Sequence, residues 1–544
     1  MRIGFALLCA LGQIARAGAA QATITPIVVN GGAAPGEPGS TWQYFTNFAI
    51  DDSGTIALFG AVQPGSGGDL SSGIWRLDAS SGWTQLSRNG GPAPGAAASE
   101  VFAQNDYPIP FLDGAGTVRF AGKLKETSGI PASQGSGLWM APAGQPLELQ
   151  IRQGRPAEGT TLGAIGPVGF ASNQAGDTVL NAGDLNGGDI WRLSPSDELT
   201  SLIRYGAQVP GAPSGVTFAG TEQNSTMQIN GSGAVAFQGL VAGSATTAND
   251  RTAFVAAPGG PVQIVAREGD PAEGIAGALY GDSVGALLTP SGEFALSAHL
   301  KTGVGGVTSA NDAVIYAPAA IGGHVPLLRE GDPAPGTSDG SHVQEPGLIL
   351  GDDGQMVVAA GLAVPGGTGL EQALWRANSQ GDLEMILRTG QGLSGLAPGA
   401  VIEGIGTVVL NDVGGMVVDV LFTPQPAEPD PQGGPPPFPP GFLPYREGIY
   451  YADPAGLFFP LLKEGDHVTL GPGDVRTLEH FFLAPFPDNA FNDRGELLVQ
   501  GYFEGGTQSL LLITVPEPAP ASLLALGLVA LAASRRDRLV RRRD

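Results

Sequence analysis

Short apolar runs alternate with glycine-rich turns along almost the whole chain. A turn tetrad, usually Asn or Asp followed three residues later by Gly, precedes an apolar run eight times, and its glycines are Gly54, Gly116, Gly176, Gly233, Gly292, Gly354, Gly414 and Gly495. An Asn or Asp side chain can bond a nearby backbone amide, and glycine takes a positive φ without a steric clash. The runs that follow are short and bounded by glycine, which predicts strands and not helices.

These turns define a repeat of about 60 residues, and a proline-rich insert at 423–444 lengthens the last interval. Each unit has a second predicted strand centred on a bulky residue: Trp75, Trp139, Trp191, Phe254, Ile315, Trp375, Tyr450 and Leu511. It closes with an apolar run, a basic residue, a glycine and a proline turn, as in Leu328–Gly336. We interpret the bulky residues as packing between units. The repeated basic residue and its acidic neighbour are interpreted as a turn and ion-pair device between blades.

The two ends of the repeat region complement each other. Residues 27–36 match the closing element although no unit precedes them, and the eighth unit stops after Leu511, before a closing element of its own. A surplus strand at the start would therefore supply the strand missing at the end, as in a ring that leaves no unpaired edge. The predicted fold is all-β: an eight-bladed β-propeller over residues 23–514, closed by an N-terminal strand that completes the last blade. A linear β-solenoid is the alternative fold.

The N-terminal segment 1–22 is predicted to be a secretory signal peptide. Arg2 precedes the apolar run Ile3–Leu11, and small residues at 17–19 and 20–22 suit a signal peptidase. The only cysteine, Cys9, lies within this segment, so the mature chain can form no disulfide and no thiolate metal site.

The C-terminal segment 515–544 has three features in order. Val515, Pro516, Glu517 and Pro518 come first, followed by the apolar stretch Ala519–Ala533, which we expect to be a transmembrane helix. An arginine-rich tail ends the chain with Arg535, Arg536, Arg538, Arg541, Arg542 and Arg543. Such a tail holds a C-terminus on the cytoplasmic side of a membrane. The apolar stretch would be about 22 Å long as a helix, which is short for a hydrocarbon core of about 30 Å. The predicted fold thus includes a C-terminal apolar helix, and a simple tail anchor is the alternative to a temporary stop.

This order of motif, apolar stretch and arginines resembles the PEP-CTERM sorting signal of Gram-negative bacteria that make exopolysaccharide. The resemblance implies that a membrane protease, an exosortase, recognises Pro516–Pro518 and releases the protein toward the cell surface or matrix. The repeat also resembles the tandem NxxGxxAF repeat of exported bacterial proteins, which Asn230, Gly233, Ala236 and Phe237 match in full. That second resemblance implies a surface-associated protein and brings no known reaction.

The net charge of the chain argues against two classes of binding partner. The formal net charge is -24, which should repel nucleic acid and anionic lipid, and no basic patch with interleaved aromatics occurs. No cofactor is expected. Loops such as 352–353 (Asp-Asp) and 311–312 (Asn-Asp) leave structural calcium as an open alternative, although no calcium-binding repeat or EF-hand spacing is present.

The sequence therefore predicts a non-enzymatic, exported protein of the cell surface or extracellular matrix, with no catalytic residues. Its expected partners are signal peptidase, an exosortase-type protease and exopolysaccharide, and its expected route passes through an inner-membrane intermediate. The alternatives are a secreted propeller enzyme, or a carbohydrate- or ligand-binding module, acting on exopolysaccharide. An enzyme should show one or two units in which unshared carboxylates or histidines cluster.

Overall fold

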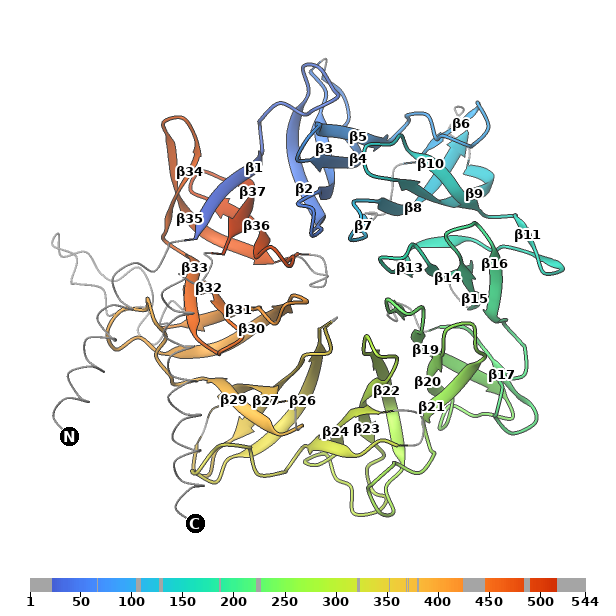
Figure 1. Ribbon diagram of the computed structural model, residues 1–544, viewed down its shortest axis with the longest axis vertical. Helices are drawn as coiled ribbons and strands as arrows, with labels where there is room; N and C mark the ends of the chain where they lie inside the picture. The colour runs from blue at the N-terminus through green and yellow to red at the C-terminus, as the bar shows by residue number, and fades with distance from the viewer. Residues whose placement is uncertain are drawn as a thin grey trace, which may run out of the picture.

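The computed structural model describes residues 22–515, except 66, 104–108, 127–130, 185–186, 222–226, 320–322, 352, 368, 370, 379–380, 424–445 and 484–489. Within these residues, eight antiparallel sheets are arranged around a ring (Figure 1). We number them as blades 1–8 and letter the strands of a blade A to D along the meander. In Figure 1 the A strand of a blade, such as β13 (Ile165–Ser172), lies beside the centre, and the D strand, such as β16 (Leu199–Ile203), lies toward the rim.

The first four blades follow the chain in order. Blade 1 is β2 (Thr41–Ile50), β3 (Ile56–Gln63), β4 (Ser71–Asp78) and β5 (Gly82–Arg88). Blade 2 is β6 (Glu100–Phe102) with β7 (Phe111–Leu112), then β8 (Val118–Glu126), β9 (Pro131–Ala141) and β10 (Glu148–Arg152). Blade 3 is β13, β14 (Thr178–Asp184), β15 (Gly187–Leu193) and β16, preceded by the small pair β11 (Pro156–Ala157) and β12 (Thr160–Thr161). Blade 4 is β17 (Val216–Phe218) with β18 (Met227–Ile229), then β19 (Val235–Gly243), β20 (Arg251–Ala256) and β21 (Val262–Arg267).

The remaining blades continue the pattern until the last one. Blade 5 is β22 (Tyr280–Leu288), β23 (Phe294–Leu300), β24 (Ala313–Ala319) and β25 (Pro326–Arg329). Blade 6 is β26 (His342–Leu350), β27 (Met356–Ala363), β28 (Glu371–Ala377) and β29 (Leu383–Arg388). Blade 7 is β30 (Ile402–Leu410), β31 (Met416–Phe422), β32 (Arg446–Ala452) and β33 (Phe458–Lys463). Blade 8 holds β34 (His467–Gly471), β35 (Asp474–Leu483), β36 (Glu496–Phe503), β37 (Thr507–Thr514) and β1 (Thr23–Val29).

The ring closes through its first strand, as the split unit in the sequence predicted. β1 pairs antiparallel with β37 from Thr23–Thr514 to Val29–Ser509, so it takes the D position of blade 8. Val28 is buried in this sheet, and its carbonyl accepts a 2.9 Å hydrogen bond from Ser509 Oγ. The edge of β37 that would otherwise be unpaired is covered by backbone from the other end of the chain.

The predicted fold class is wrong in its C-terminal apolar helix. The part of the chain that the structure describes is built from strands and turns and contains no helix. Among those residues there is accordingly no helix with the length and apolar character to span a membrane. The segment for which the helix was predicted, 519–533, lies outside the described residues. The fold observed is the eight-bladed, all-β ring alone.

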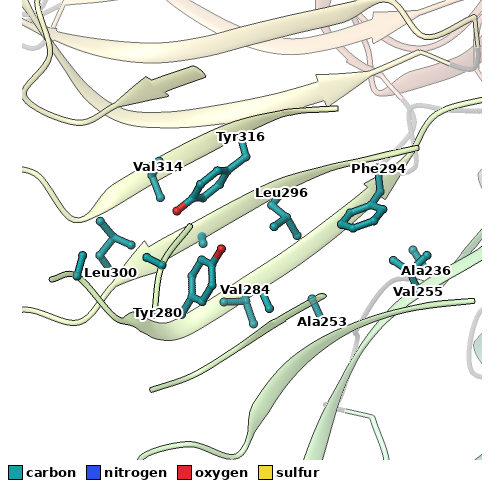
Figure 2. Packing of buried hydrophobic residues seen from close by; sticks show 14 of the residues in the cluster. Ala236, Ala253, Val255, Tyr280, Val284, Phe294, Leu296, Leu300, Val314 and Tyr316 are labelled. Atoms are coloured by element: carbon teal, nitrogen blue, oxygen red, sulfur yellow. The ribbon is translucent and has the colours of Figure 1, made fainter. Parts of the chain in front are cut away.

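The core lies between neighbouring blades. Figure 2 shows one such junction, where Tyr280, Val284 and Phe294 of blade 5 belong to the same buried cluster as Ala236 and Val255 of blade 4. All eight bulky residues of the predicted second strands are fully buried: Trp75, Trp139, Trp191, Phe254, Ile315, Trp375, Tyr450 and Leu511. Three of the indoles also donate through Nε1 to a proline carbonyl in the closing element that precedes their blade, as in Trp75–Pro35 at 3.0 Å. The interpretation of these residues as packing between units is confirmed.

The predicted turn tetrads form the A–B turns and connect neighbouring blades. Asn492 Oδ1 accepts from the amides of Arg494 and Glu496 within its own turn. Its Nδ2 donates at 2.8 Å to the carbonyl of Asp51, in the equivalent turn of blade 1. Asn173, Asn230 and Asn411 make the same bond to the next blade. Asp51 has no amide group to donate, and its buried Oδ2 has no hydrogen-bond partner.

Candidate functional site

Of the predicted sorting residues, the structure describes only Val515. Its side chain is buried, and its amide donates at 2.8 Å to the carbonyl of Gly495 in the A–B turn of blade 8. Pro516, Glu517 and Pro518 lie outside the described residues, and so do Arg535, Arg536, Arg538, Arg541, Arg542 and Arg543. The first residue of the predicted motif is therefore hydrogen-bonded to the propeller.

The basic residues of the closing elements form ion pairs in at least four blades, although their partners are not the acidic neighbours that the sequence suggested. Arg88, Arg152, Arg204 and Arg388 lie at the ends of the D strands of blades 1, 2, 3 and 6. They pair with Glu37, Glu100, Glu158 and Asp339, which lie in or next to the connections arriving from the preceding blades. The arginine of each pair is partly exposed, so each pair contributes little, about 0–1 kcal/mol. Their role is to hold each D–A connection against the blade that it enters.

Carboxylates that do not pair in this way gather between blades 7 and 8. Asp419 lies in the middle of β31, on the side that faces blade 8, since Val417 two residues before it packs with Leu478 of that blade. Glu447, near the start of the neighbouring strand β32, lies on the same face of the sheet as Asp419. Glu464, in the D–A connection, accepts at 3.2 Å from the amide of Glu447 and at 2.8 Å from Nδ1 of His480 on β35. We call these four residues, Asp419, Glu447, Glu464 and His480, the 7–8 junction.

The 7–8 junction contains a carboxyl group that is poorly solvated. Burial raises the pKa of Asp419 to about 7, and the charges of Glu447 and Glu464 add to the effect. Burial also raises the pKa of Glu447, with a further increase from Glu464. Asp419 Oδ1 is buried and has no hydrogen-bond partner. Asp419 Oδ2 lies against Gly406 on β30, where a side chain would not fit, because a Cβ atom at Gly406 would be 2.6 Å from Oδ2. The Asp419 carboxyl group therefore keeps its proton to a much higher pH than an exposed aspartate does.

A related arrangement lies between blades 5 and 6. Glu330 is buried, and its pKa is raised by burial and by a hydrogen bond in which the protonated carboxyl group donates to Asp312. Glu345 also raises the pKa of Glu330, and it lies 3.7 Å from Nε2 of His299. Glu330 and Glu464 occupy the same position in their closing elements, after the basic residue and before the glycine. We call Asp312, Glu330, Glu345 and His299 the 5–6 junction.

These junctions were not predicted from the sequence, although the repeated closing element that contributes one glutamate to each of them was recognised. Glu330 and Glu464 belong to the repeated closing element, which we interpreted only as an ion-pair device. The stronger signal was Asp419, a single charged residue within the apolar run Met416–Phe422. A buried carboxylate without a cationic partner is costly, so an acidic residue inside a core strand marks either a functional group or strain. His480 and Glu464 are 16 residues apart, and backbone hydrogen bonds between the D–A connection and β35, such as that from the Gly465 amide to the Leu478 carbonyl, bring them together.

In the loops considered for calcium, side-chain oxygens accept hydrogen bonds from backbone amides of the same loop. Asn311 Oδ1 accepts the amide of Thr308 at 2.8 Å, and Asp353 Oδ1 accepts the amide of Gln355 at 2.7 Å. Asp352 lies outside the described residues. Among the residues with assigned positions, no three His, Cys, Asp or Glu side chains are grouped so that they could hold a metal ion.

The fold and these junctions define an eight-bladed β-propeller with acidic groups at two of its blade junctions. A model for a family of unknown function, DUF7453, matches residues 19–325 and 321–522. The chain belongs to that family. No curated protein shows significant sequence similarity to it.

Solved structures resemble the chain only distantly. A protein from Lactobacillus plantarum is 12% identical with a TM-score of 0.29, and the match covers 72% of this chain and 91% of that one. Polysaccharide lyase Uly1 is 10% identical with a TM-score of 0.27, covering 66% and 94%. Pyrococcus horikoshii acylaminoacyl peptidase is 10% identical with a TM-score of 0.34, covering 85% and 57%. Similarity at this level says nothing about what this chain binds or does.

Proposed function

We propose that this protein is a non-enzymatic component of the cell surface or extracellular matrix. It is exported through its N-terminal leader and processed at its C-terminus by an exosortase-type protease. One observation supports the proposal: Val515, whose amide is hydrogen-bonded to the A–B turn of blade 8, is also the first residue of the Val-Pro-Glu-Pro motif. The residues of the proposed processing site, 516–518, therefore directly follow a residue of the propeller in the chain.

Mass spectrometry of the protein from its native host tests this route. We expect a mature product that begins near residue 23 and ends near Pro516–Pro518. Glu517→Ala should leave the uncut chain in the membrane fraction, because the protease would lose the central residue of its motif. Glu504→Ala, the same change at an exposed position on the propeller, is the matched control and should be processed normally. A mature product that retains Arg543 would contradict the proposal.

The 7–8 junction favours a second candidate function, in which the propeller binds or cleaves exopolysaccharide. A carboxyl group whose pKa is raised to about 7, with a second carboxyl group beside it, is the kind of pair that general acid–base cleavage of a glycosidic bond uses. Asp419 would be the acid and Glu464 the base. The junction meets in part the expectation for an enzyme: Asp419 is a single charged residue within an apolar strand and shares the junction with a histidine, whereas Glu464 belongs to the repeated closing element.

Incubation of the propeller with the host's exopolysaccharide tests this candidate. If it is correct, new reducing ends or stable binding should appear, and Asp419→Asn and Glu464→Gln should each lower the signal at least about 100-fold for cleavage, since general acid–base groups contribute that much. Asp69→Asn, at an exposed position on blade 1, should leave the signal unchanged. Unchanged activity in both junction variants would assign the carboxylates to structure alone.

A further inference from the structure

Blade 8 differs from the other blades in its C–D connection. In blades 1–7 the chain itself links strand C to strand D, for example through the turn between β4 and β5, or through 453–457 between β32 and β33. In blade 8, strand C is β37 and strand D is β1, and no turn joins them. Thr514 pairs directly with Thr23, so residues 22 and 515 lie side by side where a C–D turn would be. Both ends of the propeller leave it at this point.

Contacts with the A–B turns support this assignment. In blades 2, 3 and 7 the turn glycine lies against the C–D turn of its own blade, as Gly116 lies against Ala143, Gly176 against Pro195 and Gly414 against Pro454. In blade 8 the corresponding glycine, Gly495, lies against Val515 and accepts its amide. Val515 therefore occupies the place of a C–D turn residue.

The point of exit identifies one face of the ring. In an antiparallel meander the A–B and C–D turns lie at the same end of the strands, and the B–C and D–A connections lie at the other end. We call the first of these the turn face. Glu330 and Glu464 belong to D–A connections, so the acidic junctions are directed toward the opposite face.

We propose that the turn face is the membrane-facing side of the protein while its ends are held in the membrane. The inference rests on the proposed export route, in which the leader and the apolar stretch from Ala519 are both membrane-bound. The partner of the turn face is the lipid surface, and the opposite face, with both acidic junctions, is directed away from it. The same geometry lets β1 pair with β37 before either end is released, because the two attachment points are adjacent.

The length of the tether between the propeller and the apolar stretch limits which face can lie against the membrane. Three residues, 516–518, lie between Val515 and Ala519, so the four steps along the backbone span at most about 14 Å when fully extended. Strand β4 has eight residues and so is about 25 Å long. The tether is therefore shorter than the propeller is thick, and the B–C and D–A face cannot approach the lipid at the attachment point.

Two single-cysteine variants of the full chain measure the orientation. The only cysteine of the full chain is Cys9, so each variant also carries Cys9→Ser and a label at the introduced thiol reports one position. Leu70 and Ser80 are both exposed and lie at the two ends of β4, Leu70 on the B–C side and Ser80 on the turn face. Each variant, Leu70→Cys or Ser80→Cys, is labelled with a fluorophore in inner-membrane vesicles from a host without exosortase. Nitroxide-bearing lipid is then added as the quencher.

We expect quenching to be several-fold stronger at Ser80→Cys than at Leu70→Cys. A version with about 40 Gly and Ser residues inserted after Val515 should lose this difference, because the tether would then be longer than the propeller. Equal quenching with the native tether, or stronger quenching at Leu70→Cys, would overturn the orientation and leave the export route standing. Recovery of the full chain entirely outside the membrane fraction would overturn both proposals.

Discussion

A propeller that begins at residue 30, without β1, should fail to form a stable ring. The loss of β1 removes buried Val28 and partly buried Ile24 and Ile27, and it leaves the outer edge of β37 without a partner. Burying an aliphatic side chain is worth about 1.5–3 kcal/mol, so the loss amounts to about 5 kcal/mol or more, comparable with the whole stability of many domains. Urea unfolding of residues 22–515 and 30–515, followed by circular dichroism, measures the difference.

Two controls separate ring closure from a general effect of truncation. A synthetic peptide of residues 22–36 should restore the fold of the truncated chain when added in excess, while a scrambled peptide should not. Within the intact chain, Val28→Asp should be strongly destabilising, and Thr25→Asp, at an exposed position on the same strand, should cost little. A truncated chain as stable as the intact one would show that β1 is not needed for closure.

The ring was predictable because the information for it is periodic. The eight turn tetrads, such as Asn492–Gly495, predict the number of blades, and the unmatched closing element at 27–36 predicts how the last blade is completed. Each of these signals is local in sequence and repeated, so one sequence is enough to recognise it. The bulky residues are buried for the same reason, since each occupies the same place in its own blade.

The acidic junctions were not predictable in the same way, because they depend on departures from the repeat. Asp419 and His480 are contributed by neighbouring blades, and nothing in their spacing along the chain relates them. Glu464 appeared only as one copy of a repeated motif, and its contact with His480 depends on how the D–A connection pairs with β35. The C-terminal helix was expected from an apolar composition, and such a prediction gives no information on how a segment is placed relative to the ring.

Asp419→Asn should stabilise the propeller above neutral pH. Burial raises the pKa of Asp419 from 3.8 to about 7, so between these values the folded protein holds a proton that the unfolded chain has released. Stability must then fall as pH rises through this interval, and the full cost is present above pH 7. A shift of about three units corresponds to about 4 kcal/mol at most, since each unit is worth about 1.4 kcal/mol. Asparagine has the same shape and does not ionise.

The free energy of unfolding, measured in urea at several pH values, should therefore separate the two proteins. We expect Asp419→Asn to exceed the wild type by about 2–4 kcal/mol at pH 8, and the gap should close as pH falls toward 4. Asp69→Asn, at an exposed position, should follow the wild type throughout. A gap that does not change with pH would show that Asp419 is already ionised in the folded protein. If Asp419→Asn also loses the reaction with exopolysaccharide while gaining stability, the carboxyl group is kept at a cost to the fold, which is the pattern of a functional residue.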